Sequence, residues 1–382
     1  MIRQNHKKLF SFAFSKKECG TRTEYKIFGV KFRKTKRDKV IAVLRLNGLG
    51  DYILMHNFLS YIKQSKKYKD YKLMVITWNH FSSLVDDINS SCVDEFIWID
   101  FILNKPWGLK FLKKKFSRYK FDTILSPVIS DFAETEKILS LIKAKNVIGQ
   151  ECLEEEPCSK TKKLYTELIK PSSEHISEFE RNKYFFEKVL NLKIDIEKPC
   201  FKHYIDSDEK YVLFSPFAGD PQRTWSRENF ANTINYVIEK YNYKCIILGS
   251  RLDTKAALEI TSKIKPENKN FVINAIGKIA TVDLPRILKN NAKLLIANET
   301  GTVHIAAAVN CPFLVISNAR FYKRFQPYKG FEDSYIYPPK FQTLLKTNQD
   351  VSFYYNQTDL DVNEITLKDL IPKIDNMLKK NC

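Results

Sequence analysis

The feature that most constrains the fold is an alternation that begins at Val40 and runs through most of the chain. Short runs rich in β-branched residues, such as Val40–Leu46, are separated by longer amphipathic stretches, such as Asp51–Lys63. This alternation is typical of β-α-β units, which build a parallel sheet covered by helices. The further strands predicted in the first half are Lys72–Thr77, Glu95–Ile99, Thr123–Ser126 and Asn146–Ile148.

The alternation stops in a charged, proline-containing stretch, Asn191–Lys210, and starts again at Tyr211–Ser215. A chain of 382 residues is too long for one ordinary hydrophobic core. We therefore predict an α/β protein with a basic N-terminal extension (1–38) and two doubly wound, Rossmann-like domains (39–200 and 201–382) that face each other across a cleft. The last predicted helix begins at Thr366, and we leave open whether it packs back on the N-terminal domain.

The charge of the chain favours anionic partners, because the formal net charge is +19. Residues 1–40 hold 13 Lys and Arg against three acids. Two interpretations are open: a solvated tail, or a segment that binds a membrane surface through Phe10, Phe12 and Phe14 between lysines. The second would associate a cytoplasmic protein peripherally with the inner membrane. The apolar stretch Leu9–Phe14 is too short for a secretory signal, and no apolar run is long enough to span a bilayer.

The cysteines argue against a disulfide framework or a structural metal. Eight cysteines are scattered along the chain without C-x-x-C spacing. The nearest pair, Cys152 and Cys158, has glutamates and no histidine beside it. We expect no metal ion and no tightly bound cofactor.

Glycine placement indicates where a ligand would bind. The chain has only 11 glycines, and six of them follow predicted strands: Gly48, Gly50, Gly219, Gly249, Gly277 and Gly301. Ligands of doubly wound folds bind at the carboxyl ends of the strands. We therefore expect the turns that contain these glycines to face the cleft.

The first turn reads Asn47-Gly48-Leu49-Gly50-Asp51 between a strand and a helix, so its amides could face a ligand. It is not a dinucleotide fingerprint, because the third glycine of that motif would fall on the bulky Ile53. Asp51 is either a helix-start carboxylate that answers the helix dipole or a general base at the mouth of the cleft. Spacing alone favours the first interpretation.

Two later turns carry groups suited to phosphates. Arg223 follows the strand Tyr211–Ser215, and its guanidinium could clamp a diphosphate, although a surface arginine is an equally simple interpretation. The run Glu299-Thr300-Gly301-Thr302-Val303-His304 offers a hydroxyl and amides at a positive helix end. His304 lies one turn into that helix, where a histidine is more often structural than catalytic.

Taken together, the three turns resemble family 9 glycosyltransferases, the group that contains the lipopolysaccharide heptosyltransferases. The resemblance is carried by V-I-A-V-L-R-L-N-G-L-G-D-Y-I-L from Val40, by R-T-W-S-R-E-N-F from Arg223, and by N-E-T-G-T-V-H-I-A-A-A-V-N-C-P from Asn298. It covers most of residues 40–330 in order and is strongest after Leu213.

The resemblance implies a GT-B fold and an inverting, metal-independent transfer of a sugar from a nucleotide-diphosphate sugar to a lipopolysaccharide core or other anionic surface glycan precursor. It implies that Asp51 is the general base, that Arg223 binds the diphosphate, and that Glu299, Thr300, Gly301, Thr302 and His304 bind the donor. Asn47, Gly48 and Gly50 then form the acceptor or cleft loop. Glu299 and Arg223 replace the family's usual Asp and Lys, so the sequence leaves the donor sugar open.

Two alternatives belong to other classes of protein. A non-catalytic homologue that binds a nucleotide sugar would bind the donor without turnover. A nucleic-acid-binding protein would explain the charge, but the sequence has no recognisable nucleic-acid motif and its basic excess lies outside the α/β part. We therefore expect no nucleic-acid partner.

Overall fold

The structure is a computed structural model that describes residues 14–19, 22–27, 30–35, 39–128, 133–151, 162–172, 176–201 and 210–379. The first part is a separate antiparallel sheet of β1 (Phe14–Cys19), β2 (Arg22–Ile27) and β3 (Val30–Thr35). Ile27 of β2 pairs with Val30 of β3. Phe10 and Phe12 of the predicted membrane segment lie outside the described residues.

The N-terminal domain is built on a six-stranded parallel sheet with the order β6-β5-β4-β7-β8-β9. Its strands are β4 (Val40–Arg45), β5 (Lys72–Trp78), β6 (Glu95–Ile99), β7 (Phe121–Ser126), β8 (Ala144–Gln150) and β9 (Glu167–Ile169). Its helices are α2 (Leu49–Ile53), α3 (Phe58–Gln64), α4 (Ser82–Asn89), α5 (Pro106–Phe116), α6 (Ala133–Leu141) and α7 (Glu178–Leu190).

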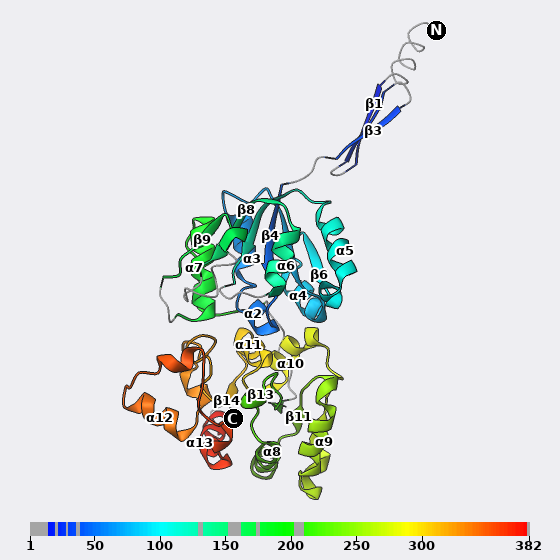
Figure 1. Ribbon diagram of the computed structural model, residues 1–382. Coiled ribbons are helices and arrows are strands. Elements are labelled where there is room, and N and C mark those ends of the chain that lie inside the picture. Colours follow the sequence, from blue (N-terminus) through cyan, green and yellow to red (C-terminus); the bar gives the residue numbers. More distant parts are fainter. Residues whose placement is uncertain are drawn as a thin grey trace.

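The C-terminal domain repeats this plan with the strand order β12-β11-β10-β13-β14-β15. Its strands are β10 (Tyr211–Ser215), β11 (Cys245–Ile247), β12 (Val272–Asn274), β13 (Ala292–Asn298), β14 (Phe313–Ile316) and β15 (Tyr335–Ile336). Its helices are α8 (Arg227–Tyr241), α9 (Thr254–Ser262), α10 (Leu284–Asn290), α11 (Gly301–Ala308), α12 (Pro339–Lys346) and α13 (Leu367–Lys379). The two domains lie one above the other in Figure 1.

Strand periodicity explains why helices cover both faces of each sheet. Every residue of β4 is buried. Ala42 and Leu44 pack in the cluster that holds α5 and α6, whereas Ile41 and Val43 pack in the cluster that holds α3, α4 and α7. A strand that is buried on both faces reads as a continuous apolar run, which is the pattern seen from Val40. The predicted α/β class is therefore confirmed.

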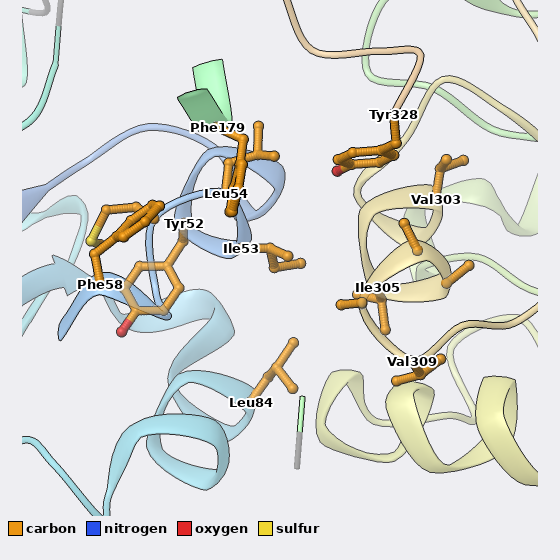
Figure 2. Close-up of a cluster of buried hydrophobic side chains, with 14 of the residues drawn as sticks. Tyr52, Ile53, Leu54, Phe58, Leu84, Phe179, Val303, Ile305, Val309 and Tyr328 are labelled. Atoms are coloured by element: carbon orange, nitrogen blue, oxygen red, sulfur yellow. The ribbon is translucent and has the colours of Figure 1, made fainter. Parts of the chain in front are cut away.

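An apolar contact joins the two domains. Ile53 of α2 points toward Val303 and Ile305 of α11, with Leu84 of α4 beside them, in Figure 2. All four side chains are fully buried and belong to one cluster that continues into both domains. This contact fixes the loop after β4 against the start of α11.

One question about the helices was left open, and one expectation about them needs correction. The last helix does not pack back on the N-terminal domain: Leu370, Ile374 and Leu378 of α13 pack in the C-terminal core with Val212 and Phe214 of β10. The predicted helix Asp51–Lys63 is instead two helices, α2 and α3.

The break between α2 and α3 is stabilised by residues far away in the sequence. Asn182 of α7 donates a hydrogen bond to the Leu54 carbonyl, and Asn89 of α4 donates one to the His56 carbonyl, both at 3.3 Å. These side chains bind carbonyls that a continuous helix would use, so sequence periodicity could not predict the break. Within the described residues, no helix combines the length and the apolar character needed to cross a membrane.

Candidate active site

The candidate site lies where the switch points of the two sheets face each other. In each domain the strand order reverses beside the first strand, between β4 and β7 and between β10 and β13. Loops that leave the carboxyl ends of strands at such a point form the binding crevice of doubly wound folds. The three predicted turns follow β4, β10 and β13, so all three start at these positions.

Asp51 in α2 is held by the loop before it and by the end of β4. Its Oδ2 accepts a hydrogen bond from the Gly48 amide at 3.2 Å, and its Oδ1 lies 3.3 Å from Nη2 of Arg45. The same Nη2 lies 2.9 Å from Oε1 of Glu178 in α7, and the other terminal nitrogen of Arg45 donates to the Pro127 carbonyl after β7. Arg45 is buried at the end of β4, so one guanidinium fixes two carboxylates and a loop.

The electrostatics of Asp51 suit a proton acceptor. Its side chain is 23% exposed, so it is accessible from the cleft. Removal from bulk water raises the pKa of Asp51, and Glu178 raises it further, whereas Arg45, Arg324 and the Gly48 amide lower it. A carboxylate with a raised pKa accepts protons more readily than an exposed aspartate.

Arg223 lies in a tight turn after β10. The Oδ1 of Asp220 accepts a hydrogen bond from the Gln222 amide and so caps the 3-10 turn Pro221–Arg223. Its Oδ2 forms an ion pair with Arg320 at 2.5 Å. The next residue but one, Trp225, is fully buried, and its backbone N–H bonds to Asn298 of β13 at 3.2 Å. The Nε of Arg223 is buried and has no partner among the described residues. The Arg223 guanidinium therefore has an N–H group that can donate a hydrogen bond to a ligand.

The third turn starts α11 with free polar groups. Thr300 is the N-cap residue, yet its side chain accepts no capping hydrogen bond, and its buried Oγ1 has no partner in the described part of the chain. The first amides of a helix carry partial positive charge and attract anions. A phosphate oxygen would satisfy both the Thr300 hydroxyl and these amides.

Glu299 precedes this turn and is almost completely buried. It accepts a hydrogen bond from the Ser317 hydroxyl. Burial raises the pKa of Glu299 to about 7, although Ser317, Arg223 and Arg320 act in the opposite direction. Near neutral pH this carboxyl is close to half protonated, so it can donate a hydrogen bond as well as accept one.

His304 contacts the first turn across the domain boundary. A β-carbon added to Gly50 would lie 2.6 Å from Cδ2 and 3.0 Å from Nε2 of His304, so only glycine allows this approach. The Nδ1 of His304 lies 2.5 Å from the Tyr328 hydroxyl. Burial, assisted by Arg223, lowers the pKa of His304 to about 4, so the ring is neutral at physiological pH.

These groups line one pocket of about 410 Å³ between the domains. Of the predicted residues, the pocket includes Gly48, Gly50, Asp51, Arg223, Glu299, Thr300, Gly301 and His304. Asn47 and Thr302 are not part of its lining; Thr302 instead lies 3.4 Å from the Ser215 hydroxyl. Among the described residues, no cluster of three or more His, Cys, Asp or Glu is placed to hold a metal ion.

Sequence reasoning missed several residues of this site. Leu49, Phe217, Phe325 and Gln326 also line the pocket, together with Gly219, whose turn was expected to face the cleft. Leu49 could have been predicted, because it lies in the first turn between Gly48 and Gly50. Glu178 and Arg45 carried no local signal, because only the fold brings α7 against the end of β4.

The structural neighbours define the class of fold. The family 9 glycosyl transferase from Veillonella parvula superposes with a TM-score of 0.68 at 16% identity, covering 90% of this chain and 98% of that one. The ADP-heptose lipopolysaccharide heptosyltransferase II of Escherichia coli gives a TM-score of 0.63 at 14% identity, covering 90% of this chain and 99% of that one. The protein therefore has the GT-B fold, as predicted.

Sequence comparison then matches part of the chain to one family. Residues 173–332 match the family described as glycosyltransferase family 9 (heptosyltransferase), which confirms the resemblance found in the motifs. Lipopolysaccharide heptosyltransferase 2 of Escherichia coli K12 is 26% identical over 118 residues, 31% of this chain. A lipooligosaccharide heptosyltransferase 2 of Haemophilus influenzae is 27% identical over 96 residues, 25% of this chain. The matched segments span about a third (33% and 27%) of the length of these curated relatives.

Proposed function

We propose that the protein is an inverting, metal-independent glycosyltransferase that moves a sugar from a nucleotide-diphosphate sugar to a lipopolysaccharide core or another surface glycan precursor. The observation that carries this proposal is the arrangement of the pocket. The Asp51 carboxylate comes from one domain, and the Arg223 guanidinium and the start of α11 come from the other. A base and an anion-binding surface that face each other are what a displacement at an anomeric carbon requires.

The reaction would proceed as a single displacement. Asp51 takes the proton from the acceptor hydroxyl as its oxygen attacks the anomeric carbon on the face opposite the diphosphate. The bond between the anomeric carbon and the diphosphate oxygen breaks, and the diphosphate leaves with the electron pair. Arg223 and the amides of α11 stabilise the charge that develops on the leaving group, so the chemistry does not require a cation.

Neutral His304 and the buried Glu299 carboxyl would add hydrogen bonds to the donor. With the Tyr328 hydroxyl on its Nδ1, His304 can present its Nε2 to the cleft beside Gly50. Glu299 can accept a hydrogen bond from a donor hydroxyl when it is ionised, or donate one to a phosphate oxygen when it is protonated. Side chains that are held in place before the donor binds are preorganised for such contacts.

The first donor to test is an ADP-linked sugar. One structural relative, the Escherichia coli heptosyltransferase WaaC, was solved with ADP and with ADP-2-deoxy-2-fluoro heptose. Thermal unfolding with ADP-, GDP- and UDP-sugars would identify the nucleobase of the donor, because a ligand that binds the native state raises the melting temperature.

We place the reaction at the cytoplasmic face of the inner membrane, where a lipid-linked acceptor would be available.

Replacement of the base tests the proposal. We expect Asp51→Ala to bind the donor with unchanged affinity and to lose transfer by about a hundredfold or more, the usual contribution of a general base. Calorimetry measures the binding, and product formation with and without EDTA measures the turnover. Donor binding without any turnover in the wild type would instead identify a non-catalytic homologue, and unchanged transfer in the variant would exclude Asp51 as the base.

A further inference from the structure

Helix α5 carries apolar residues on two opposite faces. The buried face holds Leu112 and Phe116, which pack on the N-terminal sheet. Residues that lie one turn apart share a helix face. Trp107 and Phe111 therefore share the opposite face, where their exposed fractions are 61% and 56%.

Two exposed aromatic side chains on one turn are uncommon in the described structure. Apart from this pair, the large hydrophobic side chains that are exposed are Leu252, Leu258, Ile273 and Phe353. Only one of these is aromatic, and it belongs to the other domain. Tryptophan and phenylalanine that point outward from a charged helix mark an interaction surface rather than core packing.

The charge around this pair has one sign. From Lys105 to Lys120 the chain contains seven Lys and Arg and no acidic residue. Lys110 and Lys114 follow Trp107 at helical spacing and are exposed on the same face. An aromatic strip flanked by lysines complements a surface that has anionic groups on its outside and apolar groups beneath them.

Among the residues that the structure describes, none packs over this face of α5 in the cluster to which the helix belongs. With α6, the helix covers one side of the N-terminal sheet, and its cluster contains residues of that domain alone. In Figure 1 it lies at the outer flank of the upper domain, away from the lower one. A flat surface could approach it without closing the pocket between the domains.

We propose that α5 binds the surface of an anionic phospholipid bilayer. Trp107 and Phe111 insert among the headgroups, and Lys110 and Lys114 contact lipid phosphates. This surface is independent of residues 1–38 and of the transfer chemistry, so its failure would leave the proposed function untouched.

Vesicle binding by variants of the full chain tests the surface. The variants are Trp107→Ala/Phe111→Ala and Lys110→Gln/Lys114→Gln, and the matched control is Leu252→Ala/Phe353→Ala, which removes exposed apolar groups from the other domain. With phosphatidylcholine vesicles containing phosphatidylglycerol, we expect the lysine variant to bind roughly thirtyfold more weakly. We expect the aromatic variant to lose comparable affinity, whereas the control should bind as the wild type does. Unchanged sedimentation of both α5 variants would overturn the proposal.

Fluorescence separates α5 from the basic N-terminal segment. Brominated acyl chains quench tryptophans that enter the bilayer, and only one of the four tryptophans lies on this face. We expect quenching in the wild type that disappears in Trp107→Phe, while binding persists. Quenching that survives this change would contradict insertion by α5. A wild-type dimer that dissociates in Trp107→Ala/Phe111→Ala, without lipid quenching, would identify a second copy as the occupant and overturn the proposal.

Discussion

At the residue scale, the protonation of Asp51 depends on a neighbour on another helix. Glu178 raises the pKa of Asp51 and competes with it for Arg45. Neutralising Glu178 removes a negative charge near Asp51 and leaves Asp51 as the only carboxylate that pairs with Arg45 among the described contacts. Both changes lower the pKa of Asp51.

We therefore expect Glu178→Gln to move the acidic limb of the kcat/KM profile to lower pH, by about one unit, while transfer at high pH changes less. The control is Glu180→Gln, because Glu180 is an exposed acid on the same helix. The measurement is product formation across the pH range. An acidic limb that stays in place or moves to higher pH would show that Glu178 does not tune the base.

Glu299 gives a second prediction at this scale, in the stability of the fold. Because its pKa is raised from 4.5 to about 7, the native state holds this proton more tightly than the unfolded state. Its contribution to stability is therefore full below pH 4.5 and is lost as the pH rises through 7.

We expect Glu299→Gln to remove this loss, so that the variant gains stability relative to the wild type between these pH values, by on the order of a few kcal/mol. Chemical denaturation at a series of pH values measures it. Glu364→Gln, at an exposed site, should follow the wild type. Parallel curves for Glu299→Gln and the wild type would refute the raised pKa.

At the element scale, the contact between α2 and α11 depends on glycine at position 50, which has no side chain. The His304 ring occupies the space that a β-carbon at Gly50 would need. Gly219, in the turn after β10, has nothing within 4 Å of the same position.

We expect Gly50→Ala to cost about 1–3 kcal/mol of stability through overpacking and to reduce turnover by displacing His304. Gly219→Ala should unfold as the wild type does. Thermal unfolding of both variants provides the comparison. Equal melting temperatures would mean that the two helices are not in close contact in solution.

Elements also show how much of the site could be predicted. The three turns were predictable because a chain poor in glycine retains it after strands, and the helix that starts at Gly301 appears as expected. The ion pairs of Arg45, the break between α2 and α3 and the position of α13 were not predictable. Each depends on side chains that only the tertiary fold brings together.

At the scale of the whole molecule, the two domains repeat one strand order and meet at their switch points. The alternation in the sequence was sufficient to predict two doubly wound domains. It could not place the domains relative to each other, because the apolar contact of Ile53 with Val303 and Ile305 arises from helices that look like ordinary core helices in the sequence.

If the donor site spans both domains, the Arg223 guanidinium should contribute to the binding of the donor. We expect Arg223→Ala to weaken the binding of a nucleotide-diphosphate sugar by roughly tenfold to a hundredfold, because a charge-assisted hydrogen bond to the phosphates is lost. Arg227→Ala is the matched control, since Arg227, the first residue of α8, is exposed and forms an ion pair with Glu259 of α9. Calorimetry measures both, and equal affinities would move the phosphate site elsewhere.

A crystal structure of the protein with a bound nucleotide-diphosphate sugar would show directly whether the donor lies between the two domains. We expect the diphosphate to contact Arg223 and the first amides of α11, and the anomeric carbon to face the Asp51 carboxylate across the pocket. A donor that binds outside the space between the domains, or whose anomeric carbon points away from Asp51, would contradict it.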